Sequence, residues 1–484
     1  MTVIPIITVI YILILILVII RIIYETNQSG KALAYIFLCV FIPVAGIIFY
    51  LVFGINYWNK KRYAKKVGEN GELLKVVQQN VLRFTGSDLN VDAEKLGQHK
   101  ELGTLLLKDL GSPITVNNTV TVYQNGEHKF PSVLEAINTA THHIHLEYYI
   151  YECDEIGMAI IEALILKARQ GVEVRFIYDD FGSPSISSAL ERRMKDVGIE
   201  VLPFHKIKYY LLANRFNYRN HRKILIVDGH TAFIGGINVS DKYINAEKPK
   251  RNHLYWRDTH LRIQGTGMYY LQYLFLTDWN FCCDNKLEPN ELYFADIPEC
   301  HNNCYVQIAA GGPDSLLPTV LYSLMQAINL AEEEVLITTP YFIPGDSMLD
   351  AICMAAMSGV KVKLLVPEKG DSKIVSAANR SYFSKLLQAG AEVYLYQKGF
   401  VHAKTLVSDR KLSIVGTANM DLRSFELNFE VNAVVYDEEI AEQLRKQFFE
   451  DLKDAARIDP EQWLNRPWWQ QLPEKMARLA SPVL

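Results

Sequence analysis

The sequence predicts an α/β protein of two similar lobes, with mixed β-sheets flanked by helices, a pseudo-two-fold relation and a preceding two-helix transmembrane hairpin. Three observations predict this fold: two long apolar runs near the N-terminus, a repeated order of helices and strands, and a motif that occurs twice. The 484 residues are 49% hydrophobic and 21% charged, which excludes disordered and fibrous proteins. At ~150 residues per domain, the length allows two or three units.

Two uncharged apolar runs, residues 3–20 and 32–55, open the chain. Each is long enough to cross a hydrocarbon core of about 30 Å as a helix. No basic residue precedes the first run and no small-residue cleavage site follows it, so an uncleaved hairpin over residues 1–59 fits better than a signal peptide. Pro43 and Gly46 indicate a kink or close helix packing in the second run.

Basic residues give this hairpin an orientation. Residues 60–66 (KKRYAKK) carry five positive charges, against two in the segment between the apolar runs. Because basic residues prefer the cytoplasmic side, we expect the chain from residue 60 onward to be cytoplasmic. The same cluster suits either a contact with anionic head groups or a topology signal alone. Residues 60–112 form a basic juxtamembrane segment and linker in this interpretation.

The rest of the chain is acidic. The net charge is −4 overall and +6 over the first 66 residues, which leaves −10 for residues 67–484. Nucleic-acid affinity depends on cations that neutralise phosphates, so we expect no nucleic-acid partner, and any bound phosphate needs a local cluster of cations.

Seven scattered cysteines, an odd number, predict a reducing compartment rather than a disulfide framework. One group could be imagined as a zinc site, but its spacing fits no standard ligand pattern, so we expect no metal. Its members are Cys282, Cys283, Cys300, His301 and Cys304.

The acidic part repeats one order of elements. Residues 136–204 and 327–396 each predict helix, apolar strand, helix, Gly-Val strand, helix and Gly-x-Glu-Val strand. Short apolar strands that alternate with helices predict a sheet covered on both faces. The two copies predict one lobe over residues 113–295 and a second, with a C-terminal tail, over residues 296–484, both facing one site.

Each lobe then carries H-x-K-x4-D with an Asn 17 positions after the His. The copies are HRKILIVDGHTAFIGGIN (221–238) and HAKTLVSDRKLSIVGTAN (402–419). Residues two apart in a strand share a face, so the His and Lys of each motif point the same way. Turns at the two aspartates, Asp228 and Asp409, predict hairpins that return each Asn to its His. We interpret these turn aspartates as supports of the hairpins.

Together the motifs supply groups that suit a phosphodiester. They are His221, Lys223, Asn238, His402, Lys404 and Asn419. One imidazole can attack phosphorus while the other protonates the leaving oxygen, and the lysines and asparagines can hold phosphate oxygens. An aimed imidazole needs an acceptor on its other nitrogen. Our candidates are Asp258 for His221 and Glu430 for His402, each on the next strand of the same lobe.

The doubled motif resembles the phospholipase D superfamily, and the resemblance narrows to bacterial cardiolipin synthases. The narrower match rests on the two-span hairpin with Pro43, Gly46, Tyr50 and Gly54, and on NYRNHRK (217–223), FIGGIN (233–238), WRDTHLRIQG (256–265), GGPDS (311–315), TPYFIP (339–344) and SPVL (481–484). Departures are small: the second motif reads GTAN where GSxN is commoner, and GGIN in the first lacks the hydroxyl.

The resemblance implies that two phosphatidylglycerols react to give cardiolipin and glycerol through a phosphatidyl-histidine, with no metal or other cofactor. By the superfamily's habit, His221 is the nucleophile and His402 the general acid and base. Asp228 and Asp409 belong to the catalytic motif by the same resemblance. It also implies a multi-pass protein of the bacterial plasma membrane, with anionic lipids as partners.

Other interpretations stay open. A phospholipase D, or a phosphatidyltransferase with a different acceptor, would use the same histidines. A nuclease fits the acidic charge poorly, and a non-catalytic lipid-binding scaffold fits the two complete motifs poorly. Residues 203–221 suit an interfacial lip or an inserted loop, and residues 463–479 suit either a helix on the bilayer or one docked on the core.

Overall fold

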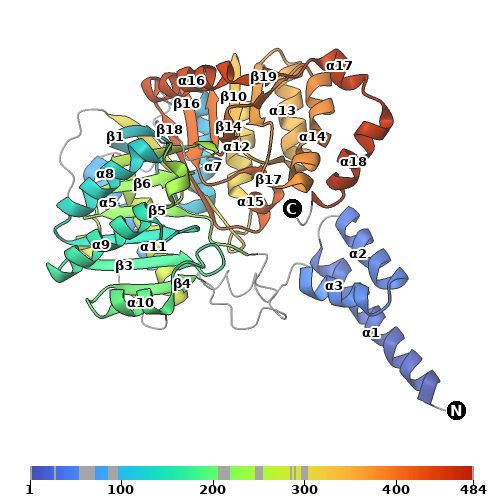
Figure 1. Ribbon diagram of the computed structural model, residues 1–484, viewed down its shortest axis with the longest axis horizontal. Coiled ribbons are helices and arrows are strands. Elements are labelled where there is room, and N and C mark those ends of the chain that lie inside the picture. The colour runs from blue at the N-terminus through green and yellow to red at the C-terminus, as the bar shows by residue number, and fades with distance from the viewer. Residues whose placement is uncertain are drawn as a thin grey trace.

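The computed structural model confirms an α/β fold with two similar lobes (Figure 1). It describes residues 3–26, 29–53, 71–85, 96–204, 218–245, 254–283, 286–287, 290–295 and 303–481. Several features of the sequence analysis lie outside these residues. They are the basic cluster 60–66, most of the segment 203–221, Cys300, His301 and the last three residues of SPVL.

The two predicted copies fold alike. The first consists of α8 (Asn125–Thr139), β2 (His143–Tyr148), α9 (Glu155–Arg169), β3 (Glu173–Asp179), α10 (Ser188–Lys195) and β4 (Glu200–Phe204). The second consists of α12 (Thr319–Asn329), β10 (Glu334–Thr338), α13 (Gly345–Met357), β12 (Lys361–Pro367), α14 (Lys373–Gln388) and β13 (Glu392–Tyr396). The alternation of apolar strands with helices therefore predicted the element order correctly.

Fifteen strands form one sheet whose order is mirrored about its centre. The first lobe adds β1 (Thr115–Gln124), β5 (Lys223–Val227), β6 (Thr231–Gly235) and β8 (Thr259–Gly265). The second lobe adds β9 (Cys304–Gly311), β15 (Thr405–Ser408), β16 (Leu412–Gly416), β18 (Glu430–Tyr436) and the edge strand β19 (Ala455–Arg457). The order β4-β3-β2-β5-β6-β8-β1 meets β9-β18-β16-β15-β10-β12-β13 at the β1–β9 pair, which gives the pseudo-two-fold relation.

One apolar core spans both lobes. It joins α11 (Met268–Cys282) and α16 (Glu438–Lys453) to buried residues of the motif strands, such as Ile224 and Val407. Separate cores lie under α8 and α9 and under α12 to α14. Because the motif strands share a core, the two lobes hold them in a fixed relation.

The remaining elements after the N-terminal helices are mostly short. They are α5 (Gly71–Thr85), η1 (Gly97–His99), α7 (Lys100–Leu110), η3 (Asp241–Tyr243), β7 (Tyr255–Arg257), η4 (Glu291–Tyr293), β11 (Phe342–Ile343), β14 (Gly399–Val401), β17 (Met420–Asp421), α15 (Leu422–Glu426), α17 (Pro460–Leu464) and α18 (Trp468–Arg478).

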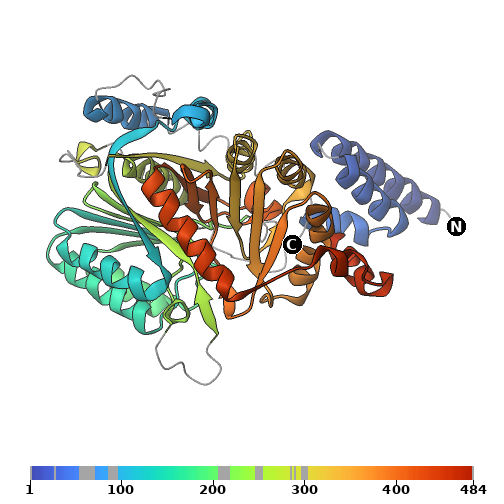
Figure 2. The same ribbon diagram turned by 90° about the horizontal axis from the view of Figure 1, so that it is seen from above.

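The N-terminal helices project from one end of the body (Figure 2). Of the described helices, α1 (Val3–Glu25) alone is long and apolar enough to cross a membrane. The second predicted span, residues 32–55, divides into α2 (Ser29–Phe41) and α3 (Ala45–Phe53). The second span is therefore interrupted at residues 42–44, where the sequence predicted a kink.

The break has a local cause. Pro43 has no N–H to donate within a helix, and Val44 takes a φ of 65°. Gly46 then approaches α2 so closely that a Cβ atom would lie 2.2 Å from the Leu38 carbonyl oxygen. The kink and close packing predicted at Pro43 and Gly46 are thus present.

The motif hairpins have the predicted register. Ile224 pairs with Ile234, and Thr405 pairs with Val415. When this register is continued toward the motif histidine, the His of each hairpin lies opposite the residue that precedes the Asn. Both turn aspartates have a φ of 51°, a conformation that Asp tolerates.

Each turn aspartate ties its hairpin to the start of the neighbouring strand. Asp228 accepts hydrogen bonds from the N–H groups of Thr141, His142 and His143, at 2.7 to 2.9 Å. Asp409 accepts in the same way from residues 332, 333 and 334. Burial raises the pKa of each carboxyl, but these bonds outweigh it and lower the pKa below its usual value. A supporting role therefore accounts for both.

We expect Asp228→Ala and Asp409→Ala each to lower the free energy of unfolding by roughly 2–3 kcal/mol, because each leaves several backbone donors without an acceptor. Chemical unfolding of the full chain in detergent, followed by near-ultraviolet circular dichroism, measures this. The control is Asp350→Ala, whose exposed carboxylate pairs with Lys385 and should change stability by less than about 0.5 kcal/mol. Equal effects in all three variants would contradict the supporting role.

Candidate active site

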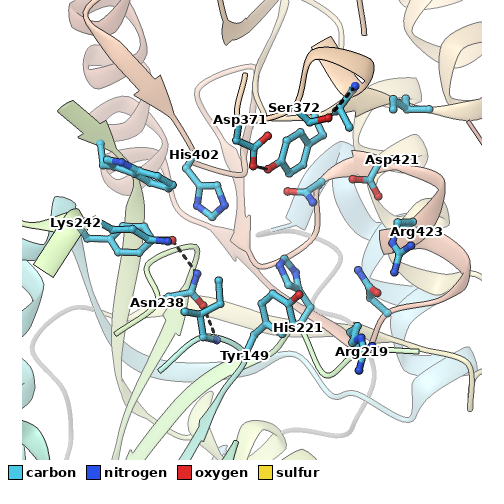
Figure 3. Close-up of a pocket in the computed structure, with 18 residues that line it drawn as sticks. Tyr149, Arg219, His221, Asn238, Lys242, Asp371, Ser372, His402, Asp421 and Arg423 are labelled. Atoms are coloured by element: carbon cyan, nitrogen blue, oxygen red, sulfur yellow. Dashed lines mark hydrogen bonds between the residues drawn. The ribbon is translucent and has the colours of Figure 1, made fainter. Parts of the chain in front are cut away.

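Both motif histidines line one cavity of about 360 Å³ (Figure 3). The lining comes from both lobes: Tyr149, Ile150, Arg219, His221, Asn238, Lys242, Tyr243 and Trp256 from the first, and Tyr341, Ile343, Asp371, Ser372, Val375, His402, Asn419, Asp421, Arg423 and Asn428 from the second. The structure therefore brings His221 and His402 together, as the spacing of the motifs predicted.

Next to each motif histidine, the backbone pairs in parallel with a segment of the opposite lobe. β14 pairs with β7, and the N–H of His402 donates to the Arg257 carbonyl oxygen at 2.7 Å. In the mirrored position, Asn220 bridges to Phe429, and the N–H of His221 donates to the Phe429 carbonyl oxygen at 3.0 Å. Each histidine thus lies beside the residue that precedes the candidate carboxylate of the other lobe.

The imidazole–carboxylate pairs are consequently exchanged. Nδ1 of His221 donates to Oε2 of Glu430 at 2.9 Å, and Nδ1 of His402 donates to Oδ2 of Asp258 at 2.7 Å. The prediction that each histidine pairs with the acid of its own lobe is wrong. In the sheet, β6 lies between β5 and β8, so the acid before β8 is two strands away from the histidine of its own lobe.

The two carboxylates have different surroundings. Glu430 also accepts from the hydroxyls of Thr417 and Ser424, at 2.5 and 2.9 Å. At the matching position of the first motif, Gly236 leaves room for Asp258, since a Cβ atom would lie 2.2 Å from Oδ1. The glycine in GGIN therefore leaves space for Asp258, while the threonine in GTAN donates a hydrogen bond to Glu430.

These contacts fix the chemical form of both rings. A carboxylate on Nδ1 leaves Nε2 as the unprotonated nitrogen. Burial lowers the pKa of both imidazoles, that of His402 to about 3. Burial raises the pKa of the Glu430 carboxyl, but His221 and Lys223 outweigh it and lower that pKa. At neutral pH both imidazoles are therefore neutral.

The motif lysines lie behind the histidines. The Nζ atom of Lys223 donates to the His221 carbonyl oxygen at 2.7 Å, and that of Lys404 donates to the His402 carbonyl oxygen. Burial lowers their pKa values to about 7 and about 8. Neither lysine is among the residues that line the cavity, and the contact with phosphate oxygens stays a prediction.

Both predicted asparagines line the cavity. Asn238 donates from Nδ2 to the Tyr243 hydroxyl at 2.8 Å and accepts from the N–H of Ile150 at 3.3 Å. Asn419 is 5% exposed, and its Oδ1 has no hydrogen-bond partner within the described chain. A buried acceptor at the cavity wall suits a hydroxyl-bearing ligand.

Sequence reasoning missed three cations at the cavity, Lys242, Arg219 and Arg423. Arg219 and Arg423 come from opposite lobes and lie on the side of His221 in Figure 3. Arg219 also stacks on Phe181 at 4.3 Å. The signal for Arg219 was present in NYRNHRK, two residues before the motif histidine. Together they provide the local positive charge that an acidic protein needs to hold phosphate.

A buried polar network anchors the first motif only. Asn220 donates to Glu147 and, from its backbone N–H, to Asp179, while Arg222 pairs with Asp278. Burial raises the pKa of Glu147 well above its usual value. The matching neighbours of His402 are the apolar residues 401 and 403. The two motifs are therefore supported by different interactions.

Two further expectations concern the turn aspartates and a metal site. Asp228 and Asp409, grouped with the catalytic residues by resemblance, support the hairpins and do not line the described cavity. No group of three or more His, Cys, Asp or Glu in the described parts of the chain is arranged to hold a metal. Cys304 instead contacts Asp437 at 3.4 Å.

Family comparisons match both lobes and the N-terminal helices. The model described as "Cardiolipin synthase, PLD-like domain" matches residues 133–252 and 324–452. A second model, "Phospholipase_D-nuclease N-terminal", matches residues 3–54. The matched ranges include both copies of the motif.

Individual proteins extend the match along the chain. A cardiolipin synthase of Geobacillus kaustophilus is 38% identical over 95% of this chain and 90% of its own length. The major cardiolipin synthase ClsA of Bacillus subtilis is 39% identical over 98% of both chains. The crystal structure of a Haemophilus influenzae phosphatidylserine synthase shares the fold, with a TM-score of 0.58 at 15% identity over 79% of this chain and 100% of that one. The chain belongs to the cardiolipin synthase family of the phospholipase D superfamily.

Proposed function

We propose that this protein is a cardiolipin synthase, which transfers the phosphatidyl group of one phosphatidylglycerol to a second and releases glycerol. One observation carries the proposal: two neutral histidines from different lobes, each oriented by a carboxylate, line one cavity together with two arginines. The names of the curated relatives support the same activity.

In the first step, Nε2 of His221 attacks the phosphorus of one phosphatidylglycerol. The bond between phosphorus and the glycerol oxygen breaks, and His402 gives that oxygen a proton. The products are a phosphatidyl-histidine and free glycerol. The incoming phosphodiester anion raises the lowered pKa of His402, so that Nε2 first takes up a proton from solvent and then gives it to the glycerol oxygen.

In the second step, His402 takes the proton from the terminal hydroxyl of a second phosphatidylglycerol. The hydroxyl oxygen forms a new bond to phosphorus, and the bond between phosphorus and His221 breaks. Arg219 and Arg423 hold the non-bridging oxygens of the phosphate. The side-chain amides of Asn238 and Asn419 bind the substrate beside these arginines. The lysines stabilise the growing negative charge from behind the rings.

The nucleophilic role of His221 is supported by its anchoring. An attacking ring must keep its position while a covalent bond forms and breaks, and the network of Asn220 and Arg222 holds the backbone on both sides of His221. The backbone beside His402 lacks equivalent polar neighbours in its sequence. His402, in contrast, only moves protons.

We further propose that α1 to α3 anchor the protein in the bacterial plasma membrane as a multi-pass segment, with the lobes in the cytoplasm and anionic lipids around them. The exposed, apolar surface of α1 and the basic cluster of residues 60–66 support this arrangement. Tethering at the bilayer raises the local concentration of lipid acceptor over water, which would otherwise give phosphatidic acid.

The purified full chain in phosphatidylglycerol vesicles should form cardiolipin and glycerol. His221→Ala and His402→Ala should each lower turnover by at least about 10³-fold, since each removes an essential group. Lipid chromatography gives the product, and acid quenching with peptide mapping identifies the phosphorylated ring. The control is His128→Ala, an exposed histidine on α8. Phosphatidic acid as the main product would identify a hydrolase instead, and full activity in either active-site variant would refute the mechanism.

Exchange of the imidazole–carboxylate pairs has its own test. We expect Glu430→Gln to change the reactivity of His221 and Asp258→Asn to change that of His402, and each to lower kcat by roughly 10–100-fold. Modification by diethyl pyrocarbonate, mapped by mass spectrometry, reports each ring separately. If Glu430→Gln changed the reactivity of His402 alone, each histidine would instead pair with the acid of its own lobe.

The buried lysines predict an alkaline limit. A lysine with a lowered pKa carries its charge below that pKa and loses it as pH rises through it. We therefore expect kcat/KM for phosphatidylglycerol to fall as pH rises past the values of about 7 and about 8 for Lys223 and Lys404. A pH profile checks this, with circular dichroism as a control for folding. A profile that stays flat well above pH 8 would show that the ammonium charges are not needed.

A further inference from the structure

An exposed apolar stripe runs along the C-terminal helix α18. Its side chains are between 46% and 81% exposed, and their spacing places them on one side of the helix. They are Trp468, Trp469, Leu472, Met476 and Leu479, with Leu479 directly after the helix. Two adjacent exposed tryptophans and a run of exposed aliphatic side chains are unusual on a surface that faces only water.

Polar contacts hold the other side of α18 on the second lobe. Glu474 is 8% exposed and accepts from Arg380 of α14 at 3.0 Å and from both Nη atoms of Arg466 at 2.9 Å. Beyond the helix, the Ser481 hydroxyl bonds to that of Tyr382 at 3.1 Å. The helix is therefore docked on the core, which was one of the two interpretations of residues 463–479. Its apolar stripe faces away from the core and takes no part in this docking.

The position of the stripe relates it to the membrane anchor. α18 lies on the same side of the body as α1 to α3 in both views (Figures 1 and 2). α14, which carries α18, begins at the cavity, where Ser372 and Val375 contribute to the lining. Ile374 in this first turn is 57% exposed. One rigid helix thus connects the cavity to the stripe.

The charges on α18 point to the nature of the partner. Its only acidic residue is Glu474, which is neutralised by two arginines. Its remaining charges, Lys475 and Arg478, are positive and exposed. An apolar stripe with tryptophans at one end and cations beside it is complementary to an anionic bilayer surface.

We infer that the exposed stripe of α18 docks on the surface of an anionic lipid bilayer, as a second membrane contact separate from α1 to α3. The contact holds α14, and with it the cavity, at the level of the lipid head groups. This inference relies on the proposed membrane anchoring, but not on the proposed catalytic steps.

Tryptophan quenching tests the contact directly. The full chain is placed in vesicles of phosphatidylcholine and phosphatidylglycerol whose acyl chains carry bromine. The emission of Trp468 and Trp469 is the difference between the unchanged protein and Trp468→Phe/Trp469→Phe, and we expect bromine to quench it. The four other tryptophans contribute the same background to both proteins. If the double variant shows the same fractional quenching as the unchanged protein, the two side chains do not reach lipid and the inference is wrong.

Turnover separates docking from folding and chemistry. We expect Leu472→Ser/Met476→Ser to raise the apparent KM for vesicle phosphatidylglycerol by about tenfold, because two buried aliphatic contacts with lipid are lost. Turnover of a water-soluble, short-chain phosphatidylglycerol should not change. Leu292→Ser, which alters a leucine that is 57% exposed and lies outside α18, is the matched control.

Three other outcomes separate the inference from its alternatives and from the proposed activity. Equal losses on vesicle and soluble substrate would show that the variant damages the fold or the site. Self-association in detergent that disappears in Leu472→Ser/Met476→Ser would identify a second copy of the chain as the partner. If the unchanged protein made no cardiolipin but its tryptophans were still quenched, the proposed activity would fail while the membrane contact stood.

Discussion

The exchanged pairing of imidazole and carboxylate is the interaction on which the site depends. His221 is oriented by Glu430 and His402 by Asp258, so neither lobe contains a complete acid–base unit. The pairing is possible because β1 and β9 join the two halves of the sheet and a common core fixes the motif strands. The buried lysines, whose amines bond to the histidine carbonyls, then add charge to an arrangement that the backbone has already set.

A symmetric fold here surrounds an asymmetric site. Gly236 and Thr417 occupy matching positions, yet one gives space to an acid and the other a hydroxyl donor. The residues beside His221 are tied into a buried polar network, while those beside His402 are apolar. In the proposed mechanism the two histidines perform different tasks, and the framework around them tolerates different neighbours because its strands are mirrored in order.

Local patterns predicted much of this protein, and long-range geometry supplied the rest. The alternation of apolar strands and helices gave the element order, and the turns at Asp228 and Asp409 gave the hairpin register. The pairing of acid with ring was wrong because chain order does not reveal that β6 separates β5 from β8. Arg219 was missed although it lies in NYRNHRK, two residues before the motif histidine, whereas no local pattern distinguishes Arg423. Pro43 and Gly46 predicted the kink in the second apolar run, but how tightly Gly46 packs against α2 is visible only in the structure.

The exchanged pairing also constrains how such a chain can have arisen. A single lobe would present a histidine without its acid and an acid without its histidine, so it could not work alone. Two identical copies related by a rotation axis would complete both pairs at once, as in a self-complementary homodimer. Fusion of the two copies into one polypeptide then frees each half to change independently, and the unequal neighbours of the two imidazoles are the divergence that such freedom permits.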